Sequence, residues 1–268
     1  MSKQAIASET FEIGLGEGLK VKGRVRAIPD GVRKPVVVVA HGFRGFQDWA
    51  FWPEVAERLA GLGYYAVSFD FSRITAKEEG LDETQVAEAS TVSQELSDLE
   101  ALLGEIKHRG LPLREEADAG KVALLGHSRS GGSSIIHAGE HPESVSAVVV
   151  WNGGASPVNV SSDPNLTLVQ RAVALDQEKN SERFNVTNHF VGLTLPALIV
   201  QGDADSQRLL DFVDRLKELA PGQKYVSIPG ANHTFGVTHP YEGATEQLNA
   251  AFEETAAFLN ESLGGKVV

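Results

Sequence analysis

The residue with the clearest chemical signature is Ser128, which lies between a hydrophobic run and a stretch of small residues. Residues 122–125 form an uninterrupted apolar run, which is typical of a strand buried on both faces. The small residues that follow, Ser130, Gly131 and Gly132, would let a helix pack closely against that strand. The sequence therefore predicts a sharp strand-to-helix turn, a nucleophile elbow, which lifts the Ser128 hydroxyl off the end of a sheet.

The elbow pattern departs from its usual form in one position. Residues 126–130 read GHSRS, whereas the usual pattern is G-x-S-x-G. Ser130 takes the place of the last glycine, and it is small enough for close packing, with Gly131 directly after it. Taken alone, the same pattern would also fit a turn that only packs a helix on a strand, or one that binds phosphate. Further motifs are needed to decide.

Composition limits the classes of protein that need to be considered. The chain has 268 residues, no cysteine and a formal net charge of −12. This acidity argues against nucleic-acid or anionic-membrane partners. The lack of cysteine excludes a thiol nucleophile, disulfides and thiolate metal sites. No stretch resembles a signal peptide or reaches membrane-spanning length, so we expect a cytoplasmic protein. A homodimer is compatible with the sequence, which does not specify an oligomeric state.

Apolar runs alternate with helical patterns along the chain, and this predicts one α/β domain over residues 1–268 with a mostly parallel sheet covered by helices on both faces. An antiparallel pair is expected over residues 10–28, where Gly14, Gly16 and Gly18 fit a hairpin better than a nucleotide-binding loop. The other predicted strands are 36–40, 65–71, 122–125, 146–151, 195–200 and 224–228. The predicted helices are 48–62 with Asp48 as N-cap, 90–109, 129–140, 166–180, 207–219 and 245–263. Residues 72–88 are expected to form a polar loop, and 155–192 a small cap insertion.

Polar residues follow the predicted strands at the edge where such sheets bind ligands. They are His41 with Gly42, Asp70, Ser128, Asp203 or Asp205, and His233. A serine, then an acid, then a histidine is the chain order of the α/β-hydrolases. The sequence resembles that superfamily over nearly its whole length. Within it, the sequence is most similar to small bacterial carboxylesterases of the dienelactone-hydrolase-like and feruloyl-esterase-like type.

The resemblance assigns three catalytic roles. Ser128 matches the nucleophile, and His233, in the segment GANHTF, matches the base that takes the serine proton. Asp205, three residues after Gly202, matches the G-x-x-D acid that orients the histidine. Asp203 is expected to bond nearby backbone N–H groups in the turn instead.

The resemblance also implies an oxyanion hole made of two backbone N–H groups. One belongs to Arg129, directly after the nucleophile, at the N-terminus of the following helix. The other belongs to Phe43, because the segment after His41 is similar to an HG-x-x-G loop. We expect His41 itself to hold that loop. The His127 side chain is expected to point away from that of Ser128, while His137, His141 and His239 are expected to serve packing or lie at the surface.

Substrate contacts are less well specified by the sequence. Trp151 and Phe43 follow predicted strands and are expected to line an acyl or alcohol pocket, although core packing would explain most aromatic residues nearby. Arg44 and Arg73 occupy loop positions where they could meet a substrate carboxylate. No metal is expected, since no H-x-H, H-E-x-x-H or acidic cluster of ligand spacing occurs, and no cofactor is expected.

The sequence thus predicts a serine hydrolase that cleaves carboxylic esters of small molecules through an acyl-enzyme intermediate. The polar 155–192 segment favours short or compact acyl groups. Dienelactone hydrolases proper use cysteine, which this chain lacks. A thioesterase, a peptidase or an acyltransferase would use the same residues, and a non-catalytic binding protein of the same fold is the alternative from another class.

Overall fold

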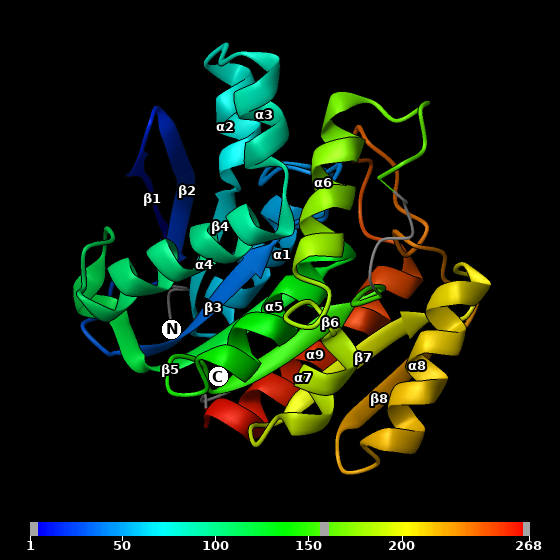
Figure 1. The fold of residues 1–268 in the computed structure, drawn as a ribbon. Coiled ribbons are helices and arrows are strands. Elements are labelled where there is room, and N and C mark those ends of the chain that lie inside the picture. The colour runs from blue at the N-terminus through cyan, green and yellow to red at the C-terminus, as the bar shows by residue number, and fades with distance from the viewer. Residues whose placement is uncertain (1–4, 156–160, 265–268) are drawn as a thin grey trace.

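One mixed sheet organises the computed structural model, which describes residues 5–155 and 161–264 (Figure 1). Its strand order is β1-β2-β4-β3-β5-β6-β7-β8. The first two strands form an antiparallel hairpin and β2 pairs antiparallel with β4, whereas all later neighbours are parallel. The strands are β1 (Ala7–Gly16), β2 (Leu19–Ala27), β3 (Lys34–Ala40), β4 (Tyr65–Asp70), β5 (Ala117–His127), β6 (Ala147–Trp151), β7 (Ala197–Gly202) and β8 (Lys224–Ile228). The mostly parallel sheet predicted from the sequence is confirmed.

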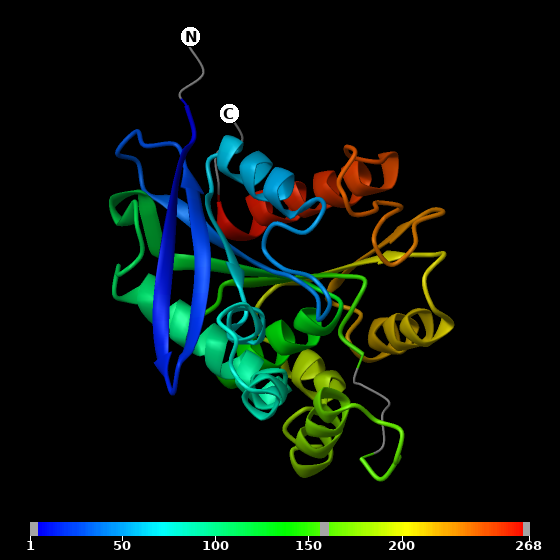
Figure 2. The same cartoon turned by 90° about the horizontal axis from the view of Figure 1, so that it is seen from above.

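Helices cover both faces of the sheet (Figure 2). One face carries α1 (Trp52–Gly61) and α9 (Glu246–Leu263). The other carries α4 (Val92–Lys107), α5 (Arg129–Glu140), α7 (Val186–Gly192) and α8 (Gln207–Leu219). A single turn of 3-10 helix, Arg114–Glu116, precedes β5.

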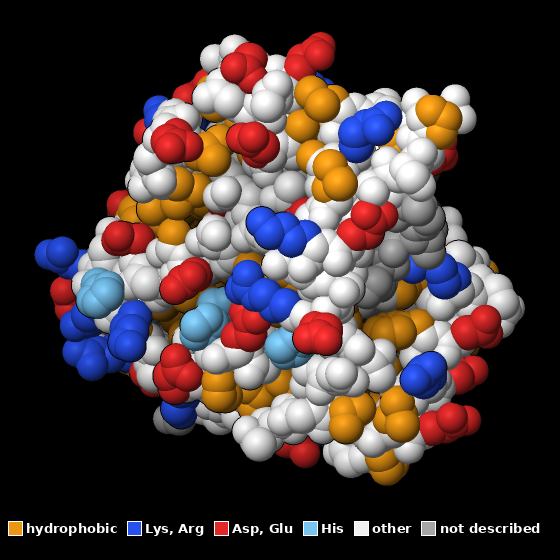
Figure 3. All heavy atoms as spheres, viewed as in Figure 1, with side chains coloured by type: hydrophobic (Ala, Val, Ile, Leu, Met, Phe, Trp, Pro, Cys, Tyr) orange, Lys and Arg blue, Asp and Glu red, His pale blue; other side chains and the backbone are white. Residues whose placement is uncertain are grey.

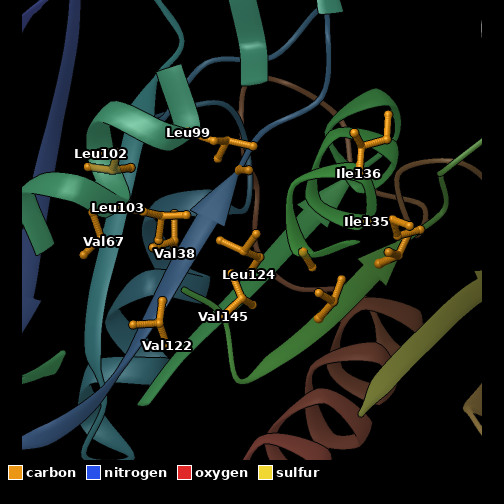
Figure 4. Close-up of a cluster of buried hydrophobic side chains, with 14 of the residues drawn as sticks. Val38, Val67, Leu99, Leu102, Leu103, Val122, Leu124, Ile135, Ile136 and Val145 are labelled. Carbon is orange, nitrogen blue, oxygen red and sulfur yellow. The ribbon is translucent and has the colours of Figure 1, made fainter. Parts of the chain in front are cut away.

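The central strands are buried on both faces, which explains their continuous apolar sequences. Along β3, Val36 and Val38 face the layer of α4 and α5, while Val37 and Val39 face α1 and α9. Figure 4 shows the first of these clusters, in which leucines of α4 meet valines of the strands beneath. The direction of chain progression reverses at β3, since β4 lies on one side of it and β5 on the other. Such a switch point is where open α/β sheets bind ligands.

The first predicted helix begins later than expected, and the Asp48 N-cap is wrong. The structure starts α1 at Trp52, with Phe51 as N-cap and no side-chain cap. Turn hydrogen bonds from Trp49 N–H to Phe46 O and from Trp52 N–H to Trp49 O precede the helix. A proline in the first turn of α1 has no N–H to satisfy and a φ already suited to a helix, so the helix can begin there without a side-chain cap.

The polar loop expected over residues 72–88 is also wrong, since two short helices occupy it. These are α2 (Ser72–Glu78) and α3 (Glu83–Ala89). Asp82 caps α3 in a reciprocal capping box with Gln85, a D-x-x-Q signal that was present in the sequence. Each helix has seven residues, too few for a hydrophobic period to be recognised.

The predicted cap insertion divides into two parts. Its residues 156–160 lie outside the described residues. Helix α6 (Leu168–Lys179) stands beside α3 above the sheet layer (Figure 1), whereas α7 packs against α5 as an ordinary covering helix. Asp176 of α6 accepts hydrogen bonds from the Ser93 N–H and hydroxyl, at 3.0 and 2.5 Å. Helices α2, α3 and α6, drawn from two separate crossovers, border a cavity beside Phe43 and Arg44, and we call these three helices the roof.

Acidic side chains are scattered over the face shown in Figure 3, interspersed with lysines and arginines. Among the helices of residues 5–155 and 161–264, none combines the length and apolar character needed to cross a bilayer.

Acid should destabilise the fold through its buried histidines, and His137 on α5 offers a clean test. Burial lowers the pKa of His137 to about 4, with His141 also lowering it and Glu140 and Glu143 acting in the opposite sense. The unfolded chain takes up this proton near pH 6.5, so stability falls as pH drops from 6.5 to 4.

The slope is the change in the free energy of unfolding per pH unit. We expect His137→Gln to reduce it by up to ~1.4 kcal/mol per pH unit, which corresponds to the uptake of one proton. Urea unfolding between pH 4 and 7 measures it. The exposed His108 is the matched control, and His108→Gln should leave the slope unchanged. Equal slopes in wild type and His137→Gln would contradict the prediction.

Candidate active site

Ser128 is the single residue between the end of β5 at His127 and the start of α5 at Arg129. Its backbone is strained, with φ 58° and ψ −124°. Two glycines make room for this turn. A Cβ on Gly126 would lie 2.5 Å from the Ser130 carbonyl oxygen, and one on Gly153 would lie 2.1 Å from the Ser128 carbonyl oxygen. The predicted strand-to-helix elbow is thus present.

The second serine of the elbow serves packing. Ser130 is fully buried, and its hydroxyl lies 2.7 Å from the Ala40 carbonyl oxygen and 3.1 Å from the His127 backbone nitrogen. These hydrogen bonds tie the ends of β3 and β5 together. Serine in place of the usual glycine therefore adds a link between two strands.

The structure brings together the three residues predicted as the triad. Ser128 Oγ lies 2.9 Å from His233 Nε2, and His233 Nδ1 lies 2.8 Å from Asp205 Oδ2. Burial by itself would raise the pKa of Asp205, but the hydrogen bonds from His233 and the Ser206 N–H outweigh it and lower that pKa. An ionised carboxylate at Nδ1 leaves Nε2 free to accept the serine proton.

Asp203 lies outside this chain of hydrogen bonds. Its side chain is exposed, and Oδ1 accepts the Gly230 N–H at 2.6 Å. The sequence led us to expect a contact within the turn after β7, whereas the partner lies on the loop after β8. The contact joins the loops after β7 and β8, the two loops that present Asp205 and His233.

The backbone of His233 is held by two side chains whose contribution the sequence did not reveal. Its carbonyl oxygen accepts hydrogen bonds from Asn152 Nδ2 at 3.1 Å and from His127 Nε2 at 2.8 Å. Asn152 is fully buried and also accepts the Gly202 N–H, so it links the ends of β6 and β7 to the histidine loop. Burial lowers the pKa of His127 to about 4, which keeps the ring neutral. His127 and Ser128 line one cavity, while their side chains bond different atoms of His233, the carbonyl oxygen and Nε2.

The two peptide units predicted to form the oxyanion hole are fixed by their carbonyl oxygens. Gly42 O accepts from His41 Nδ1 at 2.8 Å, from Gly45 N–H at 3.0 Å and from Arg73 Nη2 at 3.2 Å. In a trans peptide the N–H of Phe43 points the opposite way. A Cβ on Gly42 would lie 3.1 Å from Ser128 Cβ, so this loop borders the serine.

The second peptide unit is held in the same manner. Ser128 O accepts the N–H groups of Gly131 and Gly154, each at 3.1 Å. The N–H of Arg129, on the same peptide plane, is thereby directed away from them.

His41 is buried and structural, as the sequence indicated. Burial lowers its pKa to about 3, so the ring is neutral. Nδ1–H donates to Gly42 O, and Nε2 accepts the Phe71 N–H at 3.4 Å.

Two cavities meet at Ser128, and Phe43, Arg44 and His233 also line both. The smaller, of about 420 Å³, is lined by Gly42, Phe43, Arg44, Gly45, Trp49, His127, Ser128, His233 and Thr234. The larger, of about 740 Å³, extends under the roof to Gln170 and Val173 of α6 and to Arg208 and Leu209 of α8. Arg44 is exposed at their junction, where a substrate contact remains a prediction.

Two predicted substrate contacts are corrected. Trp151 is fully buried, stacks on Trp52 with ring centroids 5.7 Å apart, and donates its indole N–H to Thr255. It lines neither cavity because β6 turns its side chain into the core on the α9 face. Arg73 is also buried, and its guanidinium is occupied by Glu95 and by backbone carbonyls, so it is not placed to meet a substrate carboxylate.

A buried charge cluster that was not predicted from the sequence lies beside the elbow. Glu95 of α4 is fully buried and contacts Arg73 and Arg129. A signal was available, since Glu95 lies three residues after Val92 and four before Leu99, on the apolar face of its helix. Within the part of the chain that the structure describes, no three His, Cys, Asp or Glu side chains are grouped to hold a metal ion.

A mostly parallel sheet covered on both faces, with a serine elbow at its switch point, defines an α/β-hydrolase. Residues 23–263 match the dienelactone hydrolase family, and the chain belongs to it. Membership supports a hydrolase.

Solved structures share the fold at low identity. A dienelactone hydrolase from Anabaena variabilis is 20% identical with a TM-score of 0.66, over 96% of this chain and 99% of that one. Est1E from Butyrivibrio proteoclasticus is 17% identical with a TM-score of 0.70, over 95% of this chain and 99% of that one. A putative dienelactone hydrolase from Klebsiella pneumoniae is 18% identical with a TM-score of 0.68, over 96% and 99%.

Substitution of Asp205 and of Asp203, both in the loop after β7, should affect turnover and stability differently. We expect Asp205→Asn to lower kcat by roughly 10⁴-fold, because an amide at this position favours the wrong imidazole tautomer. Asp203→Asn is the matched variant and should leave kcat near that of wild type while costing about 1 kcal/mol of stability for the weakened Gly230 contact. Steady-state kinetics and urea unfolding measure both. A collapse of kcat in Asp203→Asn with normal turnover in Asp205→Asn would reverse the assignment.

Proposed function

We propose that this protein is a serine carboxylesterase that hydrolyses small esters through an acyl-enzyme intermediate. The observation that carries the proposal is the continuous hydrogen-bonded chain from Ser128 through His233 to Asp205, at 2.9 and 2.8 Å, on the wall of a cavity. Each of these side chains has the chemical type that its position requires.

In the first half of the reaction, Ser128 Oγ forms a bond to the ester carbonyl carbon while its proton passes to His233 Nε2. The carbonyl electrons move to the oxygen, which the N–H groups of Phe43 and Arg129 are proposed to bind. The intermediate then collapses. The bond to the alcohol oxygen breaks, and the alcohol leaves with the proton from His233.

In the second half, water takes the place of the alcohol. It gives a proton to His233 and attacks the acyl carbon, and Ser128 departs with that proton. The carboxylate of Asp205 stays ionised throughout and stabilises the imidazolium formed in each half.

The two cavities suggest how an ester would lie across the serine. The smaller one has the aromatic residues Phe43 and Trp49 in its wall and would suit a compact apolar group. The larger, with Asn152 and Gln170 in its wall, would suit the more polar part of the ester. Est1E has also been solved with ferulic acid bound, so a phenolic acid ester belongs among the substrates to be tested.

Covalent labelling tests the nucleophile. We expect a fluorophosphonate to add one phosphonyl group to Ser128, as located by mass spectrometry of the peptide. Ser128→Ala should abolish both labelling and hydrolysis, with a loss on the order of 10⁶ in kcat.

Ser130→Ala is the matched control. It loses the hydrogen bond to Ala40 and should cost about 1 kcal/mol of stability while retaining labelling and turnover. Labelling that persists in Ser128→Ala would refute the proposed nucleophile.

Acyl length tests the substrate class. With p-nitrophenyl esters from acetate to palmitate, kcat/KM should fall as the chain lengthens, because the apolar cavity beside Ser128 has a volume of only about 420 Å³. A maximum at palmitate, or activation at an oil–water interface, would rule out the compact-acyl preference.

A further inference from the structure

Glu95 is the most heavily contacted buried charge near the elbow. Its Oε1 accepts from Arg73 Nη1 at 2.6 Å, from Arg129 Nη2 at 2.7 Å and from Arg129 Nε at 3.0 Å. Its Oε2 accepts the Ser133 hydroxyl at 2.6 Å. No part of the proposed reaction uses this carboxylate directly, yet it lies between the two loops that carry the predicted oxyanion donors.

The cluster is charged despite its burial. Burial by itself would raise the pKa of Glu95, but Arg129 and Arg73 outweigh it and lower the pKa to about 2. Burial lowers the pKa of Arg73 to about 10, which leaves it protonated at neutral pH. Two guanidinium groups therefore bind one carboxylate out of water, where such hydrogen bonds are short and directional.

Arg73 connects Glu95 to the first predicted oxyanion peptide unit, which joins Gly42 and Phe43. With one nitrogen on Glu95, its guanidinium donates through Nη2 to Gly42 O at 3.2 Å and through Nε to Phe43 O at 3.3 Å. Because a guanidinium is planar and rigid, these three bonds fix two successive carbonyl groups at once. Holding Gly42 O fixes the opposite direction of the Phe43 N–H.

Arg129 passes the restraint to the second peptide. Its backbone N–H is the other predicted donor, while its side chain is anchored on Glu95 and on Ser90 O at 2.9 Å. The guanidinium carbon also lies 4.1 Å from the centre of the Phe43 ring. The side chain of one donor residue thus stacks on the side chain of the other.

We propose that Glu95, through Arg73 and Arg129, is a positioning residue that sets the two backbone N–H groups of the oxyanion hole relative to each other. The inference rests on the proposed esterase function. It assigns Glu95 no contact with substrate. Its consequence is that loss of the cluster should weaken binding of the transition state more than binding of the ester.

A second buried ion pair provides the control for a purely structural role. Lys34 Nζ lies 2.8 Å from Glu116 Oε2, and Glu116 also accepts the Gly31 N–H at 3.0 Å. Both side chains are less than a tenth exposed. This pair lies at the start of β3, at the opposite end of the sheet from Ser128. Glu116→Gln removes a buried carboxylate without touching either oxyanion peptide.

The experiment compares Glu95→Gln, Arg73→Lys and Glu116→Gln with wild type in three measurements: urea unfolding, kcat and KM for p-nitrophenyl acetate, and the inhibition constant of 2,2,2-trifluoroacetophenone. The inhibitor adds to the serine oxygen and places a negative oxygen where the oxyanion forms. Arg73→Lys keeps a positive charge beside Glu95 but loses the planar guanidinium that contacts three oxygens at once. It therefore tests the geometry of these contacts in a folded protein, even where Glu95→Gln is too unstable to assay.

We expect Arg73→Lys and Glu95→Gln to lower kcat by about 10²-fold with little change in KM, and to weaken the trifluoromethyl ketone in proportion to kcat/KM. Glu116→Gln should lose stability yet keep wild-type kcat and inhibition. If Arg73→Lys and Glu95→Gln lose stability only, as Glu116→Gln does, the positioning role is refuted and the esterase proposal survives. If the wild type itself neither hydrolyses esters nor takes a fluorophosphonate label, the esterase proposal fails and the positioning role with it.

Discussion

The site depends on how closely the backbone can approach itself at Ser128. The strained turn between β5 and α5 exists only because no Cβ occupies Gly126 or Gly153, where one would overlap a carbonyl oxygen. Such a conformation costs on the order of 1–3 kcal/mol and persists when its surroundings over-determine it. Here the end of β6 supplies that restraint, since the segment after Trp151 packs on the turn and Gly154 N–H binds Ser128 O. The elbow is therefore a property of two adjacent strands, and β5 alone could not maintain it.

Around that turn, the two predicted oxyanion peptide units and the His233 loop are held by hydrogen bonds to backbone carbonyl oxygens. The Gly42 oxygen has three donors, and the Ser128 and His233 oxygens have two each. A carbonyl with several donors cannot rotate without losing more than one hydrogen bond in a dry environment, where each is expensive to lose. Fixing each of these oxygens thus also fixes the N–H of the following residue, which lies on the same peptide plane. His41, His127 and Asn152 supply donors from strand ends, while Arg73 and Gly131 supply donors from α2 and α5.

How much of this the sequence could predict follows from the range of each interaction. Strands buried on both faces can be recognised from a local apolar run, such as the valines of β3. The order of Ser128, Asp205 and His233 along the chain indicated which loops meet. Helices α2 and α3 escaped because seven residues cannot display a period. The environment of Trp151 was not predictable. Side chains alternate between the two faces of a strand, and the sequence of a fully apolar strand does not show which face each residue occupies.

The buried cluster around Glu95 illustrates a different limit. An acidic residue on the apolar side of α4 is visible in the sequence, but its two arginine partners lie 22 residues before it and 34 after it, on α2 and α5. Their meeting depends on how three helices pack over the sheet. A charge on an apolar helix face signals that partners exist without saying which they are.

The roof over the site has a consequence for how proteins of this architecture can diversify. Helices α2, α3 and α6 belong to two different crossovers, and α6 is fastened to the helical layer where Asp176 binds the first turn of α4. Neither crossover contributes a residue of the proposed triad, but the one between β4 and β5 carries Arg73 and Glu95. Insertions or deletions there would reshape the surface above Ser128 while the strand register beneath stays intact. Changes in α3 and α6 could therefore alter ligand preference with less effect on turnover than changes in α2, which carries Arg73 and so reaches the Gly42 carbonyl.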